Sequence, residues 1–110
     1  MSFTHLHVHS QYSLLDGLPN IPDLVAKAKA LDMTALALTD HGAMYGAIEF
    51  YQACKKVGIK PIIGAEVYIA PRSYTDKQPR LDDRPNHLIL LAETTGGYHH
   101  LIQLVTKSHL

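Results

Sequence analysis

The 110-residue chain is poor in several residue types, and each shortage excludes a class of protein. A single cysteine, Cys54, excludes an internal disulfide framework and a cysteine-rich zinc module. Ten lysines and arginines are balanced by ten acidic residues, so the chain lacks the positive charge by which an autonomous nucleic-acid-binding domain neutralises phosphates. No apolar run approaches the roughly 18 residues of a membrane span, and no signal peptide is recognisable, so we expect a cytoplasmic location without membrane contact.

The hydropathy pattern predicts an α/β fold built from four successive β/α units. Short apolar runs typical of strands cover residues 3–8, 34–39, 61–63 with a continuation over 67–70, and 87–92. Helical periodicity covers 21–31, 45–57 and 98–108, and residues 71–85 form a long loop that is functional or mobile. Alternating units of this kind predict a parallel sheet with right-handed crossovers, either a small open sheet or part of a barrel.

Histidine is in excess, with eight in the chain, and several histidines and acids fall where predicted strands end. His7 and His9 close the first run, Asp40 and His41 close the second, and Glu66 follows the third. Parallel strands place such residues at one rim, and a His-x-His pair lies on one face of a strand. This nitrogen and oxygen set suits zinc, manganese or iron. Each part also has a structural reading: His7 and His9 suit ordinary surface or core histidines, Asp40 and His41 a helix cap with its turn, and Glu66 a solvated charge.

Four motifs in order resemble the PHP (polymerase and histidinol phosphatase) domain, in the form found at the start of bacterial DNA polymerase III alpha subunits. They are His5 to Gly17, Ala37 to Gly42, Gly58 to Glu66, and His87 to Ala92 with Thr95 to Tyr98 after it. The resemblance covers essentially the whole chain. It implies a distorted (βα)7 barrel with up to three metals clustered at the ends of its strands. Residues 1–110 would be the N-terminal part of a single, incomplete PHP domain.

The resemblance also assigns site residues. By motif position, the metal ligands would be His7, His9, Asp16, His41, Glu66 and His87, and the cofactors would be divalent metal ions, zinc first, with manganese or iron as alternatives. Asp40 takes the place of a catalytic acid beside the metals. His87 raises a geometric difficulty, because its predicted place at the start of a strand is away from the rim. The later ligands of the family have no counterpart here, and we expect His99, His100 and His109 to face solvent.

The implied function is metal-dependent phosphodiester hydrolysis, as a 3′–5′ proofreading exonuclease within a DNA-directed DNA polymerase. The alternatives are a metal-stabilised platform for replisome subunits and a stand-alone PHP-type phosphatase. The expected partners are DNA, through the longer parent protein, and other replisome subunits. We expect little catalysis from the chain alone, and we expect it to dimerise through open sheet edges.

Overall fold

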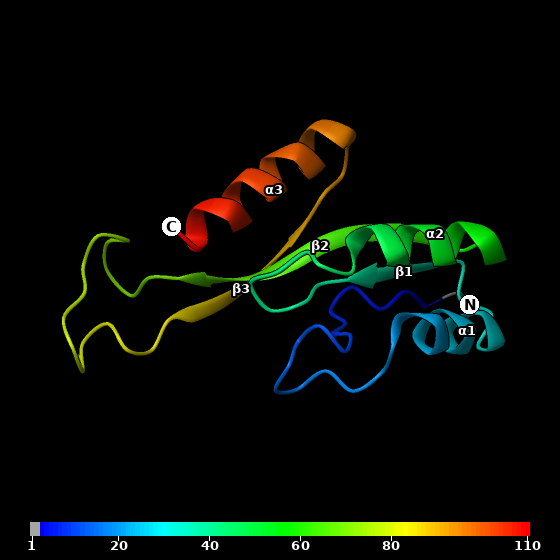
Figure 1. Cartoon of the computed structure of the whole chain (residues 1–110), viewed down its shortest axis with the longest axis horizontal. Coiled ribbons are helices and arrows are strands. Elements are labelled where there is room, and N and C mark those ends of the chain that lie inside the picture. The colour runs from blue at the N-terminus through cyan, green and yellow to red at the C-terminus, as the bar shows by residue number, and fades with distance from the viewer. Residues whose placement is uncertain (1–2) are drawn as a thin grey trace.

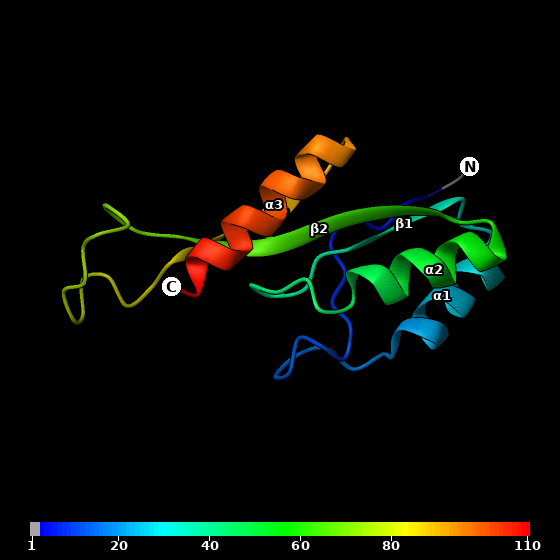
Figure 2. The ribbon, with the colours of Figure 1, turned by 45° about the horizontal axis from the view of Figure 1, so that its top comes forward.

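A computed structural model describes residues 3–110 of the chain. The elements in chain order are α1 Ile21–Ala30, β1 Ala35–Leu38, α2 Ala47–Val57, β2 Lys60–Ile69, β3 Asn86–Leu91 and α3 Thr95–Ser108 (Figure 1). Helices α1 and α2 lie side by side, while α3 lies apart from them and contacts β2 (Figure 2). Within the described part of the chain, no helix has the length and apolar character needed to cross a membrane.

The hydrophobic core lies between the first two helices and the first two strands. Helix α1 begins after Asn20, whose side chain accepts a hydrogen bond from the Asp23 backbone N–H at 2.9 Å and so satisfies one of the free donors of the first turn. Apolar residues three and four positions apart turn one face of each helix inward. The core residues are Ile21, Val25, Ala28, Leu36, Leu38, Phe50, Cys54 and Ile59. This packing fixes β1 and β2, the two strands that carry much of the candidate site.

The sheet is mixed, with the strand order β1-β2-β3. Strands β1 and β2 are parallel, from the pair Ala35 and Lys60 to the pair Leu38 and Ile63, as predicted. Strands β2 and β3 are antiparallel, from the pair Gly64 and Leu91 to the pair Ile69 and Asn86. The expectation of a wholly parallel sheet of four β/α units was therefore wrong. Residues 70–85 form no helix, so no crossover helix connects β2 to β3. The chain instead turns back, and β3 pairs with β2 in the opposite direction.

Strand β2 is longer than its sequence pattern predicts, because it runs without interruption through Gly64. This glycine allows the close approach of β3. A Cβ atom at Gly64 would lie 2.5 Å from the carbonyl oxygen of Leu90, which is closer than any ordinary van der Waals contact. The third predicted run and its continuation are thus one strand of ten residues.

Residues 3–8, predicted as the first strand, form no regular strand. The segment runs beside β1 (Figure 1) and accepts hydrogen bonds at His5 and Val8 from the N–H groups of Ala37 and Thr39, at 3.0 and 2.8 Å. Its two acceptors are three residues apart, whereas the donors on β1 are two apart. The extra residue breaks the regular ladder in the manner of a β-bulge.

Candidate metal centre

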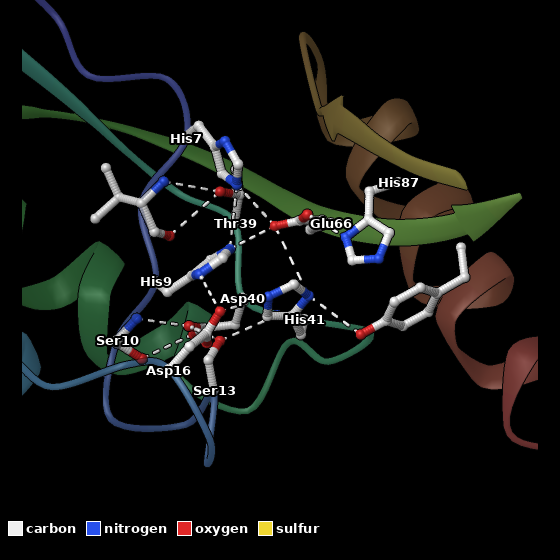
Figure 3. A network of polar contacts seen from close by, with 12 residues as sticks. His7, His9, Ser10, Ser13, Asp16, Thr39, Asp40, His41, Glu66 and His87 are labelled. Atoms are coloured by element: carbon white, nitrogen blue, oxygen red, sulfur yellow. Dashed lines mark hydrogen bonds and ion pairs between the residues drawn. The ribbon is translucent and has the colours of Figure 1, made fainter. Parts of the chain in front are cut away.

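Glu66 lies at the centre of a cluster of imidazoles. Its side chain is on β2 and the residue is only 4% exposed. The Nε2 atoms of His7 and His9 lie 2.7 and 2.5 Å from Oε2 of Glu66, and Nδ1 of His87 lies 2.7 Å from Oε1. Figure 3 shows these rings pointing toward the carboxylate from different segments of the chain. Both oxygens of Glu66 are therefore in contact with histidine.

The antiparallel pairing of β3 resolves the difficulty over His87. In the register of the two strands His87 lies opposite Tyr68, two residues beyond Glu66 on β2. Because β3 runs in the opposite direction, its first residues lie beside the last residues of β2. The predicted start of this strand was correct to one residue, and only its assumed direction placed His87 far from the other histidines.

Asp16 and His41 form the second part of the cluster. Oδ2 of Asp16 lies 2.8 Å from Nε2 of His41 and 3.3 Å from Nδ1 of His9. The parallel ladder between β1 and β2 places His41, because its backbone bridges that of Glu66. The Glu66 N–H donates to the carbonyl of Asp40 at 3.0 Å, and the Gly42 N–H donates to the carbonyl of Glu66 at 2.8 Å.

The structure thus brings together all six residues to which the sequence assigned a metal. Their donor atoms form three groups, within which every pair of atoms lies inside 4.8 Å: His7, His9 and Glu66; His9, Asp16 and His41; His41, Glu66 and His87. Three residues are shared between groups, so the groups are contiguous. The Nε2 atoms of His7 and His9, only 3.2 Å apart, both face one carboxylate oxygen. Converging imidazole and carboxylate donors fit divalent zinc, manganese or iron.

The electrostatics of Glu66 reflect this environment. Burial raises the pKa of Glu66, but hydrogen bonds from His87, His7 and His9 and the nearby charge of His41 outweigh burial and lower it to about 2. The carboxyl group therefore stays ionised, the form in which a carboxylate binds a cation.

Asp40 is 1% exposed and makes its side-chain contacts with two serines of the loop after His9. Its Oδ1 accepts hydrogen bonds from the Ser10 N–H at 2.6 Å and the Ser13 hydroxyl at 2.8 Å, and its Oδ2 accepts from the Ser10 hydroxyl at 2.8 Å. The Ser13 Oγ in turn accepts the His41 N–H at 3.1 Å. These bonds connect the loop that carries Asp16 to the end of β1.

Two contacts at the cluster were missed by the sequence analysis. The Tyr68 hydroxyl lies 3.1 Å from Nδ1 of His41, and Nε2 of His109 lies 2.7 Å from the carbonyl oxygen of Gly42. Tyr68 follows Glu66 by two residues, a spacing that puts both on one face of a strand and is a usable signal. His109 is exposed as predicted, but it also reaches this region from the end of α3. Both line a cavity of about 500 Å³ that opens beside Asp16 and His41.

Comparisons with known proteins agree on one family and one architecture. The family model of the PHP domain matches residues 5–110. The DNA polymerase III subunit alpha of Borreliella burgdorferi is 53% identical over 109 residues, 98% of this chain and 10% of that protein. Its counterpart from Treponema pallidum is 50% identical over 111 residues, 100% of this chain and 10% of that protein. The chain therefore spans about a tenth of the length of these curated relatives.

Solved structures show the same fold. An amidohydrolase from Chromobacterium violaceum, with bound sulfate and no metal, is 26% identical with a TM-score of 0.63, and the match covers 91% of this chain and 32% of that one. A protein from Bifidobacterium adolescentis described as a metal-dependent phosphoesterase is 20% identical with a TM-score of 0.65, over 93% of this chain and 32% of that one. The present chain thus corresponds to about a third of each of these larger structures.

Proposed function

Because this chain belongs to the PHP domain family, we propose that it is the N-terminal part of such a domain, at the start of a bacterial DNA polymerase III alpha subunit. Its function is the metal-dependent hydrolysis of phosphodiesters, as a 3′–5′ exonuclease during DNA replication in the cytoplasm. Relatives about half identical over the whole chain support this assignment. Polymerisation itself belongs to the longer protein, of which the chain is about a tenth.

The observation that carries the proposal is the contact of three imidazoles with the single buried carboxylate of Glu66. The metal ligands are the six residues predicted from the sequence: His7, His9, Asp16, His41, Glu66 and His87. Glu66 belongs to two of the three donor groups and joins them. When bound, divalent ions supply Lewis-acid activation of water and neutralise the charge of the phosphate.

The other residues of the site orient the ligands. Asp40, which the sequence analysis assigned as a catalytic acid, acts through Ser10 and Ser13 to hold the loop of Asp16 against the end of β1. Asp16 is half exposed at the cavity, so it lies on the side from which substrate enters.

A nuclease assay on the longer protein that contains this chain tests the proposal. The substrate is a 5′-labelled single-stranded oligonucleotide with zinc or manganese, and the expected product is a ladder shortened from the 3′ end. His9→Ala and EDTA each abolish this ladder. His99→Ala, on the exposed side of α3, is the matched control and leaves it unchanged. An unchanged ladder in His9→Ala contradicts the proposal.

Two other outcomes identify the alternatives. Hydrolysis of p-nitrophenyl phosphate without shortening of DNA indicates a phosphatase. A large rise in melting temperature with metal, and hydrolysis of neither substrate, indicates a structural platform for replisome subunits. The isolated chain is expected to show little or no activity in the same assays.

We propose that DNA and other replisome subunits are the partners of the longer protein, and that the isolated chain self-associates. Within residues 3–110 the outer edge of β3 pairs with no further strand. Exposed strand edges pair readily with other strands, so a dimer would form there. A monomer in sedimentation runs at high concentration contradicts the self-association.

A further inference from the structure

Tyr68 contacts two of the histidines assigned to the cluster, although no motif of the sequence includes it. It lies on β2 two residues after Glu66 and is 50% exposed. Its ring lies nearly parallel to that of His41, with centroids 6.0 Å apart and planes 10° apart, and meets the ring of His87 edge-on at 4.9 Å. Its hydroxyl lies 3.1 Å from Nδ1 of His41.

His41 faces two donor groups with its two different ring nitrogens. Nε2 lies 2.8 Å from Asp16, whereas Nδ1 lies 3.7 Å from Oε2 of Glu66. A neutral imidazole carries a hydrogen on one nitrogen and a lone pair on the other, so it can offer a metal ion only one of them. The nitrogen that carries the hydrogen therefore decides which of the two groups His41 completes.

Glu66 and Asp16 differ in the number of imidazole nitrogens, other than those of His41, that lie near their carboxylates. Glu66 already has the Nε2 atoms of His7 and His9 within hydrogen-bond distance of one oxygen. Asp16 has only Nδ1 of His9, at 3.3 Å, besides His41. A His9 that uses Nε2 toward Glu66 leaves His41 as the remaining imidazole for Asp16.

We propose that Tyr68 is a positioning residue that assigns His41 to Asp16. Its hydroxyl oxygen accepts the Nδ1–H of His41, which leaves the Nε2 lone pair directed at the group that contains Asp16. The near-parallel ring holds the imidazole in that orientation. A hydrogen bond to the non-ligating nitrogen is a common way of fixing the tautomer of a metal-binding histidine. The inference rests on the proposed function only in requiring that this group binds a divalent ion.

The variant Tyr68→Phe tests this directly, because it keeps the ring and removes the hydroxyl. The chain is labelled with nitrogen-15 in its histidines and titrated with an NMR-active cadmium isotope, whose coupling identifies the nitrogen bound to the metal. In the natural chain we expect coupling to Nε2 of His41 and a proton on Nδ1. In Tyr68→Phe the preference for Nε2 is lost, and cadmium affinity at this group falls by about 10-fold to 100-fold.

Tyr45→Phe is the matched control, since Tyr45 lines the same cavity and is exposed, and it leaves the spectrum of His41 unchanged. Coupling to Nδ1 of His41 in the natural chain overturns the inference, as does Nε2 coupling with undiminished affinity in Tyr68→Phe, or an absence of cadmium at His41. Because no hydrolysis is measured, the result is independent of the nuclease assay. Cadmium bound through Nε2 without exonuclease activity contradicts the proposed function alone.

Discussion

The Nε2 atoms of His7 and His9 lie 3.2 Å apart, although the two side chains belong to a segment that forms no regular strand. Two imidazoles with nitrogens this close, both beside Oε2 of Glu66, form a pair able to bind one ion together. Hydrogen bonds from Ala37 and Thr39 hold this segment beside β1, and both rings converge on Glu66 of β2. Loss of either ring therefore removes half of a chelate.

We expect His7→Ala to lower the affinity of the chain for zinc by at least about 100-fold. Loss of a residue that only hydrogen-bonds to a metal ligand already lowers metal affinity by about 10-fold to 100-fold, and His7 is proposed as a ligand itself. Competition with a fluorescent zinc chelator measures this. His100→Ala, an exposed histidine on α3, is the control and retains the natural affinity. Equal affinities of His7→Ala and the natural chain would show that His7 is not a ligand.

The low pKa of Glu66 predicts a loss of stability in acid. The pKa is about 2 in the folded chain against an ordinary value of 4.5. Between these values the unfolded chain binds more protons, so stability present above about pH 4.5 is lost as the pH falls toward 2, by roughly 3 kcal/mol in all.

Urea unfolding of the metal-free chain at a series of pH values measures this effect. Glu66→Gln is less stable than the natural chain near neutral pH, and the difference shrinks as the pH falls below about 4.5. The comparison between the two proteins removes the contribution of the other carboxylates. A difference that stays constant down to about pH 2 argues against a depressed pKa at this position.

Asp40→Asn is expected to destabilise the fold by about 2 to 4 kcal/mol. The buried carboxylate accepts three hydrogen bonds, and bonds to a charged group contribute roughly 1.5 to 3 kcal/mol each. The amide that replaces one oxygen is a donor facing other donors. Denaturant unfolding checks the value, with the exposed substitution Glu93→Gln as the neutral control. A change below about 0.5 kcal/mol, as at ordinary surface sites, contradicts this role for Asp40.

Cys54 is expected to be unreactive in the folded chain. It is fully buried in α2, and burial raises the pKa of its thiol to about 11, so almost no thiolate forms near pH 8. Labelling by a thiol-disulfide reagent should be negligible in buffer and rapid in urea. Fast labelling of the folded chain would mean that α2 opens locally without global unfolding.

Local patterns in the sequence predicted the elements that local forces determine. The Asn20 cap and the apolar spacing of α1 gave its start and its length to within one residue. The direction of β3 depends on the path of the chain through residues 70–85. Hydropathy periodicity predicts a strand but does not show whether it runs parallel or antiparallel to its neighbour. The contacts of Asp40 with Ser10 and Ser13 join residues 30 and 27 positions apart, so no local pattern could reveal them.

The six candidate ligand positions could be predicted because each was assigned by its place in a sequence motif, which requires no knowledge of the three-dimensional structure. The structure adds the way in which they meet. His87 reaches Glu66 through an antiparallel strand, and His41 reaches it through the parallel ladder. Tyr68 belongs to no motif, and only its spacing from Glu66 gave a sign of its position.

The hairpin of β2 and β3 also has a consequence for the order in which the chain folds. Glu66 and His87 are 21 residues apart, whereas Glu66 and His7 are 59 apart. Closing the longer loop costs about 0.9 kcal/mol more chain entropy, and long-range contacts form more slowly. Pulse-labelling hydrogen exchange should show protection of β3 before that of Ala37, whose N–H donates to His5. During folding, Glu66 and His87 would therefore come together first. The N-terminal histidines His7 and His9 would be the last to reach the cluster.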